Sequence, residues 1–144
     1  QLWMCECFCG NRFEQLPAKV KAGRIQSCGC LRTSGREIII EKFLKKQNIK
    51  YQSQYSFDDL WDKGKLRFDF AILDENNKPK VLIEYDGQQH FIPVKLYGGE
   101  ENLERSQHRD NLKNEYCKSN NLKLLRLKYD LSDEEIKSQI FNAL

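Results

Sequence analysis

The sequence has few of the residues that keep a chain from folding. Of its 144 residues only 8 are glycine and 3 are proline, whereas 31% are charged, and this composition predicts a folded chain. It has no internal repeat, no signal-peptide pattern at its start and no apolar run that approaches the length of a membrane span. We therefore expect no membrane partner, no secretion and a cytoplasmic location. The length leaves room for one ordinary domain, or for a small domain beside a metal-stapled module.

Positive charge is concentrated in the first third of the chain. Residues 1–50 hold ten Lys or Arg against four acids, a balance of +6, whereas residues 51–144 hold fourteen against seventeen, a balance of −3. A basic front beside an acidic remainder suits a protein that holds a polyanion and brings a metal to it; a solvated basic helix would have the same charge. The cations available to phosphates are Arg12, Lys19, Lys21 and Arg24.

Cysteine is nearly absent beyond residue 30. Five of the six cysteines crowd the start of the chain, as Cys5, Cys7, Cys9, Cys28 and Cys30. This clustering favours ligation over a disulfide framework, which would spread bridges across the fold and need an oxidising compartment. Two thiolates from each of two glycine-containing turns can close a tetrahedral zinc site. We predict structural zinc on Cys7, Cys9, Cys28 and Cys30, with Cys5 as an alternative to Cys7.

Three reactive groups stand close together in residues 81–90, which read Val-Leu-Ile-Glu-Tyr-Asp-Gly-Gln-Gln-His. Alternation at period two predicts a buried strand with Glu84 and Asp86 on the same side. Burying two anions side by side is costly unless a cation or a proton joins them. Asp86 and Gly87 then offer a turn, and His90 follows it. The segment indicates a chemical site; the alternative is a half-buried strand whose polar face is acidic.

The elements before this strand bring two more acids toward the core. A helix over about residues 36–47 places Glu37 on its apolar stripe, where a metal or its bound water, a backbone cap or an arginine could be its partner. An edge strand over 49–57 and a polar connection over 58–65 lead to a strand over 66–73, with Asp69 on one face. The opposite face is predicted to hold Leu66, Phe68, Phe70 and Ile72. An antiparallel hairpin through residues 74–80 then sets Asp69 within reach of Glu84.

The elements predicted after residues 81–90 complete an order of helices and strands that is typical of α/β proteins. A helix over about residues 101–118 has one face that holds Gln107, Asp110, either Lys113 or Asn114, and Cys117, with Asp110 directed inward. A strand over 122–129 follows as a return strand of the parallel type, and a capping box formed by Ser132 and Glu135 opens a closing helix. This order predicts a mixed sheet flanked by helices.

The motifs resemble those of a known nuclease superfamily. An Asp on one strand and a Glu on the next is the arrangement of the PD-(D/E)xK nucleases, but here Asp86 stands where that pattern has lysine. The chain therefore resembles a narrower clade, the very-short-patch-repair endonucleases and the related phage homing endonucleases, whose active site is summarised as EDxHD. The match runs over residues 34–129 and rests on Arg-Phe-Asp-Phe, Ile-Glu-Tyr-Asp-Gly-Gln-Gln-His and Gln-His-Arg-Asp-Asn-Leu-Lys-Asn-Glu-Tyr-Cys.

This resemblance implies a Mg²⁺-dependent endonuclease that acts on double-stranded DNA. The catalytic set that carries over is Glu37, Asp69, Glu84, His90 and Asp110. In it Asp69 and Glu84 hold Mg²⁺, His90 takes a proton from the attacking water or steadies the pentacoordinate phosphorus, and Asp110 orients the imidazole. Glu37 acts through metal-bound water. Accessory roles fall to Asp86, Gln88 and Lys113, Asp86 either helping the metal or only shaping the turn.

The predicted domain organisation follows from the cysteine motifs and the nuclease-like motifs together. The cysteine motifs resemble a zinc ribbon placed before the nuclease domains of mobile elements, so we expect a zinc ribbon over residues 1–33 and a restriction-endonuclease-like domain over 34–144. Because the sequence opens with Gln1 rather than Met, we expect a fragment of a phage-encoded or bacterial protein, with further DNA-binding segments upstream. A homing enzyme is the predicted function; a mismatch-directed nicking enzyme and a non-catalytic zinc-containing DNA-binding module are the alternatives.

Overall fold

The computed structural model describes residues 1–6, 12–25, 35–87, 91 and 99–144. Within it the chain divides into two compact units, Gln1–Ile39 and Ile40–Leu144, which are described separately. The boundary predicted between residues 33 and 34 lies outside the described residues. No helix in the described ranges is long and apolar enough to cross a membrane.

The first unit contains a short hairpin and a short helix. Strands β1 (Trp3–Glu6) and β2 (Arg12–Gln15) pair antiparallel, and helix α1 (Pro17–Lys21) follows with proline in its first turn. Strand β2 and helix α1 lie between the two predicted cysteine pairs in the sequence. Proline begins α1 readily because the first helical N–H has no partner in the helix.

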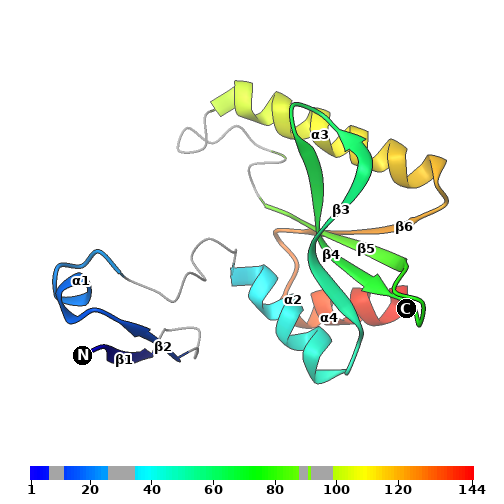
Figure 1. Ribbon diagram of the computed structural model, residues 1–144. Coiled ribbons are helices and arrows are strands. Elements are labelled where there is room, and N and C mark those ends of the chain that lie inside the picture. Colours follow the sequence, from blue (N-terminus) through cyan, green and yellow to red (C-terminus); the bar gives the residue numbers. More distant parts are fainter. Residues whose placement is uncertain (7–11, 26–34, 88–90, 92–98) are drawn as a thin grey trace. The chain divides into compact units, whose positions relative to one another are not determined.

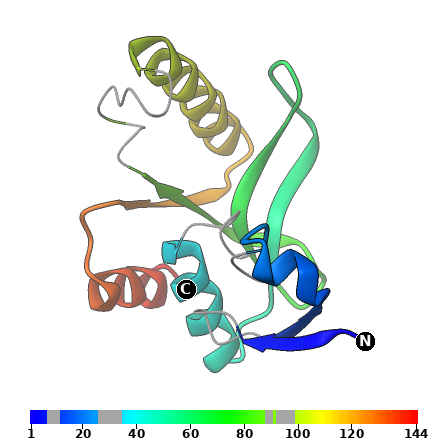
Figure 2. The same cartoon turned by 90° about the vertical axis from the view of Figure 1, so that its left-hand side faces the viewer.

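The second unit is built on a mixed sheet of four strands, β3 (Tyr51–Trp61), β4 (Lys65–Leu73), β5 (Pro79–Asp86) and β6 (Lys123–Lys128), in that spatial order. Only the β5–β6 pair is parallel, and β3 is an edge strand, as expected. Helices α2 (Gly35–Lys46) and α4 (Asp133–Ala143) cover one face, and α3 (Gly99–Ser119) covers the other (Figures 1 and 2). This confirms the α/β class and the mixed sheet flanked by helices.

Each face of the sheet buries its own hydrophobic cluster. The α2/α4-side cluster joins Ile40 and Leu44 of α2 and Ile136 and Ile140 of α4 to strand residues such as Ile83. The α3-side cluster joins Cys117, with Leu112 and Tyr116 at its margin, to strand residues that include Leu82 and Phe68. A strand covered on both faces is apolar on both, which explains the run Val81–Ile83 that precedes Glu84.

The structure corrects two details of the hairpin formed by β3 and β4. The polar connection expected over 58–65 is wrong, because β3 continues to Trp61, which pairs with Lys65 across a register shift. Buried Leu60 and an ion pair of 2.6 Å between Lys65 Nζ and Asp58 Oδ1 hold this extension. The fold therefore gains a long hairpin arm that the polar composition of the segment concealed.

The second correction concerns the alternation along β4. Leu66 and Phe68 pack in the α3-side cluster, whereas Phe70 and Ile72 pack in the α2/α4-side cluster, so the single face expected for these four residues is wrong. The change of side falls opposite Gln54 on β3, whose φ of 52° departs from extended backbone. Such a residue interrupts the regular pleat and increases the local twist.

Candidate active site

The site begins at the tight turn between β4 and β5. One carboxylate oxygen of Asp74 accepts hydrogen bonds from the backbone N–H groups of Asn76 and Lys78, at 2.8 and 2.9 Å, which fixes the turn. The turn sets an antiparallel register in which Ala71 faces Leu82 and Phe70 faces Ile83. The pairing ends next to Asp69 on β4 and Glu84 on β5, the two acids that the sequence predicts to lie within reach of each other.

Two contacts join Asp69 to this part of β5. Its Oδ2 accepts a hydrogen bond of 2.8 Å from the backbone N–H of Tyr85, and its carboxyl group shares a side-chain hydrogen bond with that of Glu84. Glu84 is buried, with 5% of its surface exposed. Burial first, and the negative charge of Asp69 second, raise the pKa of Glu84 from 4.5 to about 8. Near neutral pH this carboxyl group therefore holds a proton or needs a cation.

The cation that contacts Glu84 is a lysine of helix α3. Lys113 of α3 donates a hydrogen bond from Nζ to Oε1 of Glu84, and the side chains are only 13% and 7% exposed. The same ammonium lies 5.3 Å from the centre of the Phe68 ring. The positive charge of Lys113 opposes the rise in the pKa of Glu84 without cancelling it. The structure thus unites buried Glu84 with partly buried Asp69 and Lys113 in one group.

A second ionic group lies beside the first, on Arg126 of β6. Arg126 faces Glu84 in the parallel β5–β6 register, and its Nη1 lies 2.7 Å from Asp86 Oδ1 and 3.6 Å from Asp110 Oδ1. Its other nitrogens donate to the backbone carbonyl of Asp110 at 3.2 Å and to Asn114 Oδ1 at 2.8 Å. Asp86, whose side chain is 8% exposed, is therefore held by an arginine that ties β5 and β6 to α3.

Sequence reasoning did not name Arg126. The available signal was a lone cation within the apolar run Leu124-Leu125-Arg126-Leu127 of a strand expected to be buried. A buried cation needs an acid, and the nearest strand carried two. The parallel register that joins them became visible only in the fold.

The acidic pair is chemically suited to a divalent cation. Oxygen ligands suit Mg²⁺, which is usually held by one or two carboxylates while keeping several waters. Two neighbouring carboxyl groups that resist joint ionisation are stabilised as anions by such an ion. Among the described residues, no group of three or more His, Cys, Asp or Glu side chains is placed to hold a metal. Asp69 and Glu84 would therefore supply two ligands, the rest being water and phosphate oxygens.

Several predicted site residues lie outside the described residues. These are His90, Gln88 and the four predicted zinc ligands Cys7, Cys9, Cys28 and Cys30. Cys5 is described: it is a half-buried free thiol in β1, 3.7 Å from the carbonyl oxygen of Trp3. Glu37 lies half-buried in the first turn of α2, within the first unit. Its membership of the site stays a prediction.

The four cations predicted to meet DNA are all exposed on the first unit, namely Arg12, Lys19, Lys21 and Arg24. Arg12 pairs with Glu6 at 3.2 Å, and the ammonium of Lys21 lies 5.3 Å from the Trp3 ring. Both contacts are at the surface, where ion pairs are worth little and exchange readily for other partners. Their proposed role in DNA binding is untested by these contacts.

Comparison with known proteins places the chain in a family. No solved structure matches it. Over 79 residues it is 36% identical to "Uncharacterized protein 307L" of Invertebrate iridescent virus 6, a stretch that covers 54% of this chain and 39% of the viral protein. The model of a family described as "Protein of unknown function (DUF2726)" matches residues 36–144, which hold the whole of the four-stranded sheet. The chain therefore belongs to the DUF2726 family.

Proposed function

We propose that the chain is a metal-dependent DNA endonuclease, most closely a homing-type enzyme of a phage or mobile element. The observation that carries the proposal is the contact between Lys113 and Glu84 beside Asp69. Two acids and a lysine on a mixed α/β sheet are the groups of a PD-(D/E)xK site. In this chain the lysine would come from α3, because Arg126 already holds Asp86 at the strand position where lysine is expected.

Each residue has a distinct task in this proposal. Mg²⁺ bound by Asp69 and Glu84 would supply positive charge to the scissile phosphate and acidify the attacking water. Lys113 would favour the ionised form of Glu84 that the metal needs and offer a second positive charge to the phosphate. His90 would accept the proton of the water, because imidazole titrates near neutral pH. Glu37 would position water at the metal, and structural Zn²⁺ on Cys7, Cys9, Cys28 and Cys30 would hold the first unit together.

Asp110 is assigned to the imidazole of His90. Its Oδ1 lies 3.6 Å from Arg126 Nη1, and a carboxylate can accept several hydrogen bonds, so an imidazole N–H can be one of its donors. Arg126 would then fix the position of Asp110, and Asp110 the orientation of His90. The restriction-endonuclease-like fold and the zinc ribbon belong to the same proposal.

A non-catalytic DNA-binding module is the second candidate, and one observation favours it. Lys113 and Arg126 pair with Glu84 and Asp86, and the described residues contain no buried side-chain polar atom without a hydrogen-bond partner. A satisfied network of this kind can be structural only. The two functions differ in their dependence on Mg²⁺, since a structural network has no need of the ion.

The test is cleavage of supercoiled plasmid DNA by the purified chain with and without Mg²⁺. The proposal expects Mg²⁺-dependent cleavage that falls at least about 100-fold in Asp69→Asn, Glu84→Gln and His90→Ala, with folding retained. Glu75→Gln, an exposed acid in the β4–β5 turn, is the matched control and should cut normally. Undiminished cleavage by the Asp69 and Glu84 variants, or DNA binding without cleavage in any divalent ion, would overturn the nuclease.

A further inference from the structure

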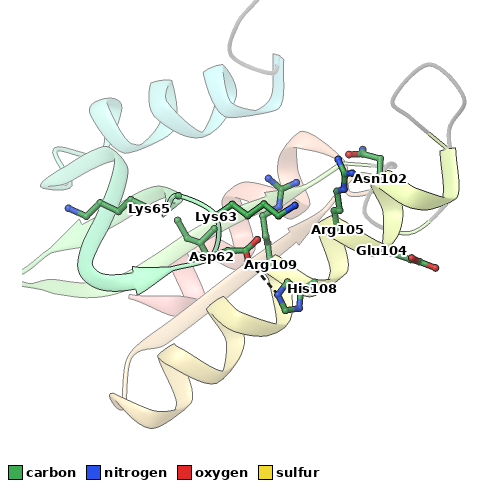
Figure 3. Close-up of a pocket in the computed structure, with 10 residues that line it drawn as sticks. Asp62, Lys63, Lys65, Asn102, Glu104, Arg105, His108 and Arg109 are labelled. Atoms are coloured by element: carbon green, nitrogen blue, oxygen red, sulfur yellow. Dashed lines mark ion pairs between the residues drawn. The ribbon is translucent and has the colours of Figure 1, made fainter.

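A pocket of about 660 Å³ lies between the β3–β4 hairpin arm and the N-terminal half of α3 (Figure 3). Its lining holds four permanent cations, Lys63, Lys65, Arg105 and Arg109, against two acids, Asp62 and Glu104, and it also holds His108. The second unit as a whole is neutral in sequence, with 18 Lys or Arg against 18 acids, so this local excess of positive charge is not an average property of its surface. Such a surface favours a ligand of opposite charge.

The ion pairs within the pocket leave two of its cations available. Arg105 pairs with Glu101 at 2.6 Å, Lys65 with Asp58 at 2.6 Å, and His108 lies 3.6 Å from Asp62. Lys63 and Arg109 form no ion pair with any described residue. In Figure 3, Lys63 extends from the hairpin toward the side of α3 that carries Arg105 and Arg109, whereas Lys65 points away.

One row of cations on α3 connects the pocket with the candidate active site. Arg105, Arg109 and Lys113 follow one another at intervals of four residues on α3, so they form one row along the helix. Each interval advances about 6 Å along the axis. Lys113, at one end of this row, is the residue that contacts Glu84, and Arg105 and Arg109 line the pocket. An anionic strand with one phosphate at the acidic pair would continue along this row.

We infer that this pocket is a binding site for the sugar–phosphate backbone of duplex DNA, next to the scissile phosphate. The inference rests on the proposed nuclease function, because it assumes that a phosphate occupies the site at Asp69 and Glu84. Arg109 contacts the DNA backbone from α3, and Lys63 contacts it from the hairpin arm. Contacts of this kind position the duplex and carry no sequence information. Its residues are different from the four cations predicted on the first unit to bind DNA.

The experiment measures binding of a fluorescent duplex by the full chain, without added Mg²⁺ so that the DNA is not cut. Lys63→Ala/Arg109→Ala should raise Kd roughly 10- to 100-fold at 0.1 M salt and reduce the slope of log Kd against log salt by about two. Lys78→Ala/Lys80→Ala, at the opposite end of β4, removes the same charge from exposed positions and should change neither quantity to this extent. Lys63→Arg/Arg109→Lys keeps both charges and should restore tight binding.

The outcomes separate this site from the nuclease activity. Equal weakening by both double alanine variants, or no weakening by Lys63→Ala/Arg109→Ala in a chain that cuts plasmid, overturns the backbone site and leaves the nuclease standing. A wild-type chain that binds duplex through Lys63 and Arg109 but never cuts supports the site and overturns the nuclease. A wild-type chain that binds no duplex overturns both, and tighter binding of single-stranded RNA than of duplex DNA overturns the stated ligand.

Discussion

Lys113 on α3 and Glu84 on β5 form a buried ion pair, although 29 residues separate them in the sequence. The pair lies beside Asp69, so a lysine from a helix stands next to two acids from adjacent strands. The sequence predicts only an accessory role for Lys113. Its position on Glu84 makes it the central residue of the proposed site and the first one to test.

Replacing Lys113 should separate catalysis from folding. Lys113→Met keeps a long unbranched side chain beside Phe68 but removes the charge, and we expect plasmid cleavage to fall about 100- to 1,000-fold. Lys113→Arg keeps a cation at the acidic pair and should recover part of the rate. Glu115→Gln, an exposed change on the same helix, is the control. Normal cleavage by Lys113→Met would show that the lysine is structural.

The stability of the metal-free protein should fall as pH rises, because of Glu84. Its pKa is about 8 in the folded chain and about 4.5 when the group is exposed, so between these values the folded state keeps a proton that the unfolded chain has released. The contribution is complete below pH 4.5 and lost as pH approaches 8. We expect urea unfolding to show a loss of a few kcal/mol across this window.

The control for this pH effect is the Glu84→Gln variant, which cannot titrate and should flatten the profile. Glu75→Gln should leave the profile unchanged. Added Mg²⁺ should reduce the slope, because an ion at Asp69 and Glu84 favours the ionised carboxyl groups. A wild-type profile that is flat, or one that rises between pH 5 and 8, would contradict the assigned burial and charge of Glu84.

Arg126 should contribute more to stability than any surface cation. Arg126→Met removes the guanidinium that lies 2.7 Å from buried Asp86, and removal of one partner of a buried ion pair typically costs about 3 kcal/mol or more. Arg126→Lys keeps the charge but loses the fork that also reaches Asn114 and Asp110, so its cost should be intermediate. Urea unfolding gives both values. Lys80→Met, an exposed change on β5, should cost much less; an equal cost would refute the buried network.

Zinc content tests the prediction for the first unit. We expect about one zinc per chain by elemental analysis, lost in Cys28→Ser and retained in Cys117→Ala, since Cys117 is a buried residue of the α3-side cluster. Chelation should release the metal and unfold the first unit, while the sheet of the second unit keeps its circular dichroism signal. A chain that folds fully without zinc would remove the zinc ribbon from the proposal.

Local signals predicted much of the fold. The turn residues from Asp74 onward and the apolar runs beside them located the β4–β5 hairpin, and with it the approach of Asp69 to Glu84. The capping box of Ser132 and Glu135 located the start of α4, where both of its hydrogen bonds are present. These features depend on residues near one another in the chain, so the sequence contains the information needed to predict them.

The sequence by itself determined the α/β order, the antiparallel hairpin that joins two acids, and the acidic side of β5. Only the tertiary structure decided which cations meet those acids. Lys113 and Arg126 reach Glu84 and Asp86 because α3 crosses the sheet and β6 pairs parallel with β5. Those contacts depend on how distant segments pack, which short-range periodicity does not specify. The long β3–β4 arm and its basic pocket were hidden for the same reason, since buried Leu60 anchors a segment whose composition is polar.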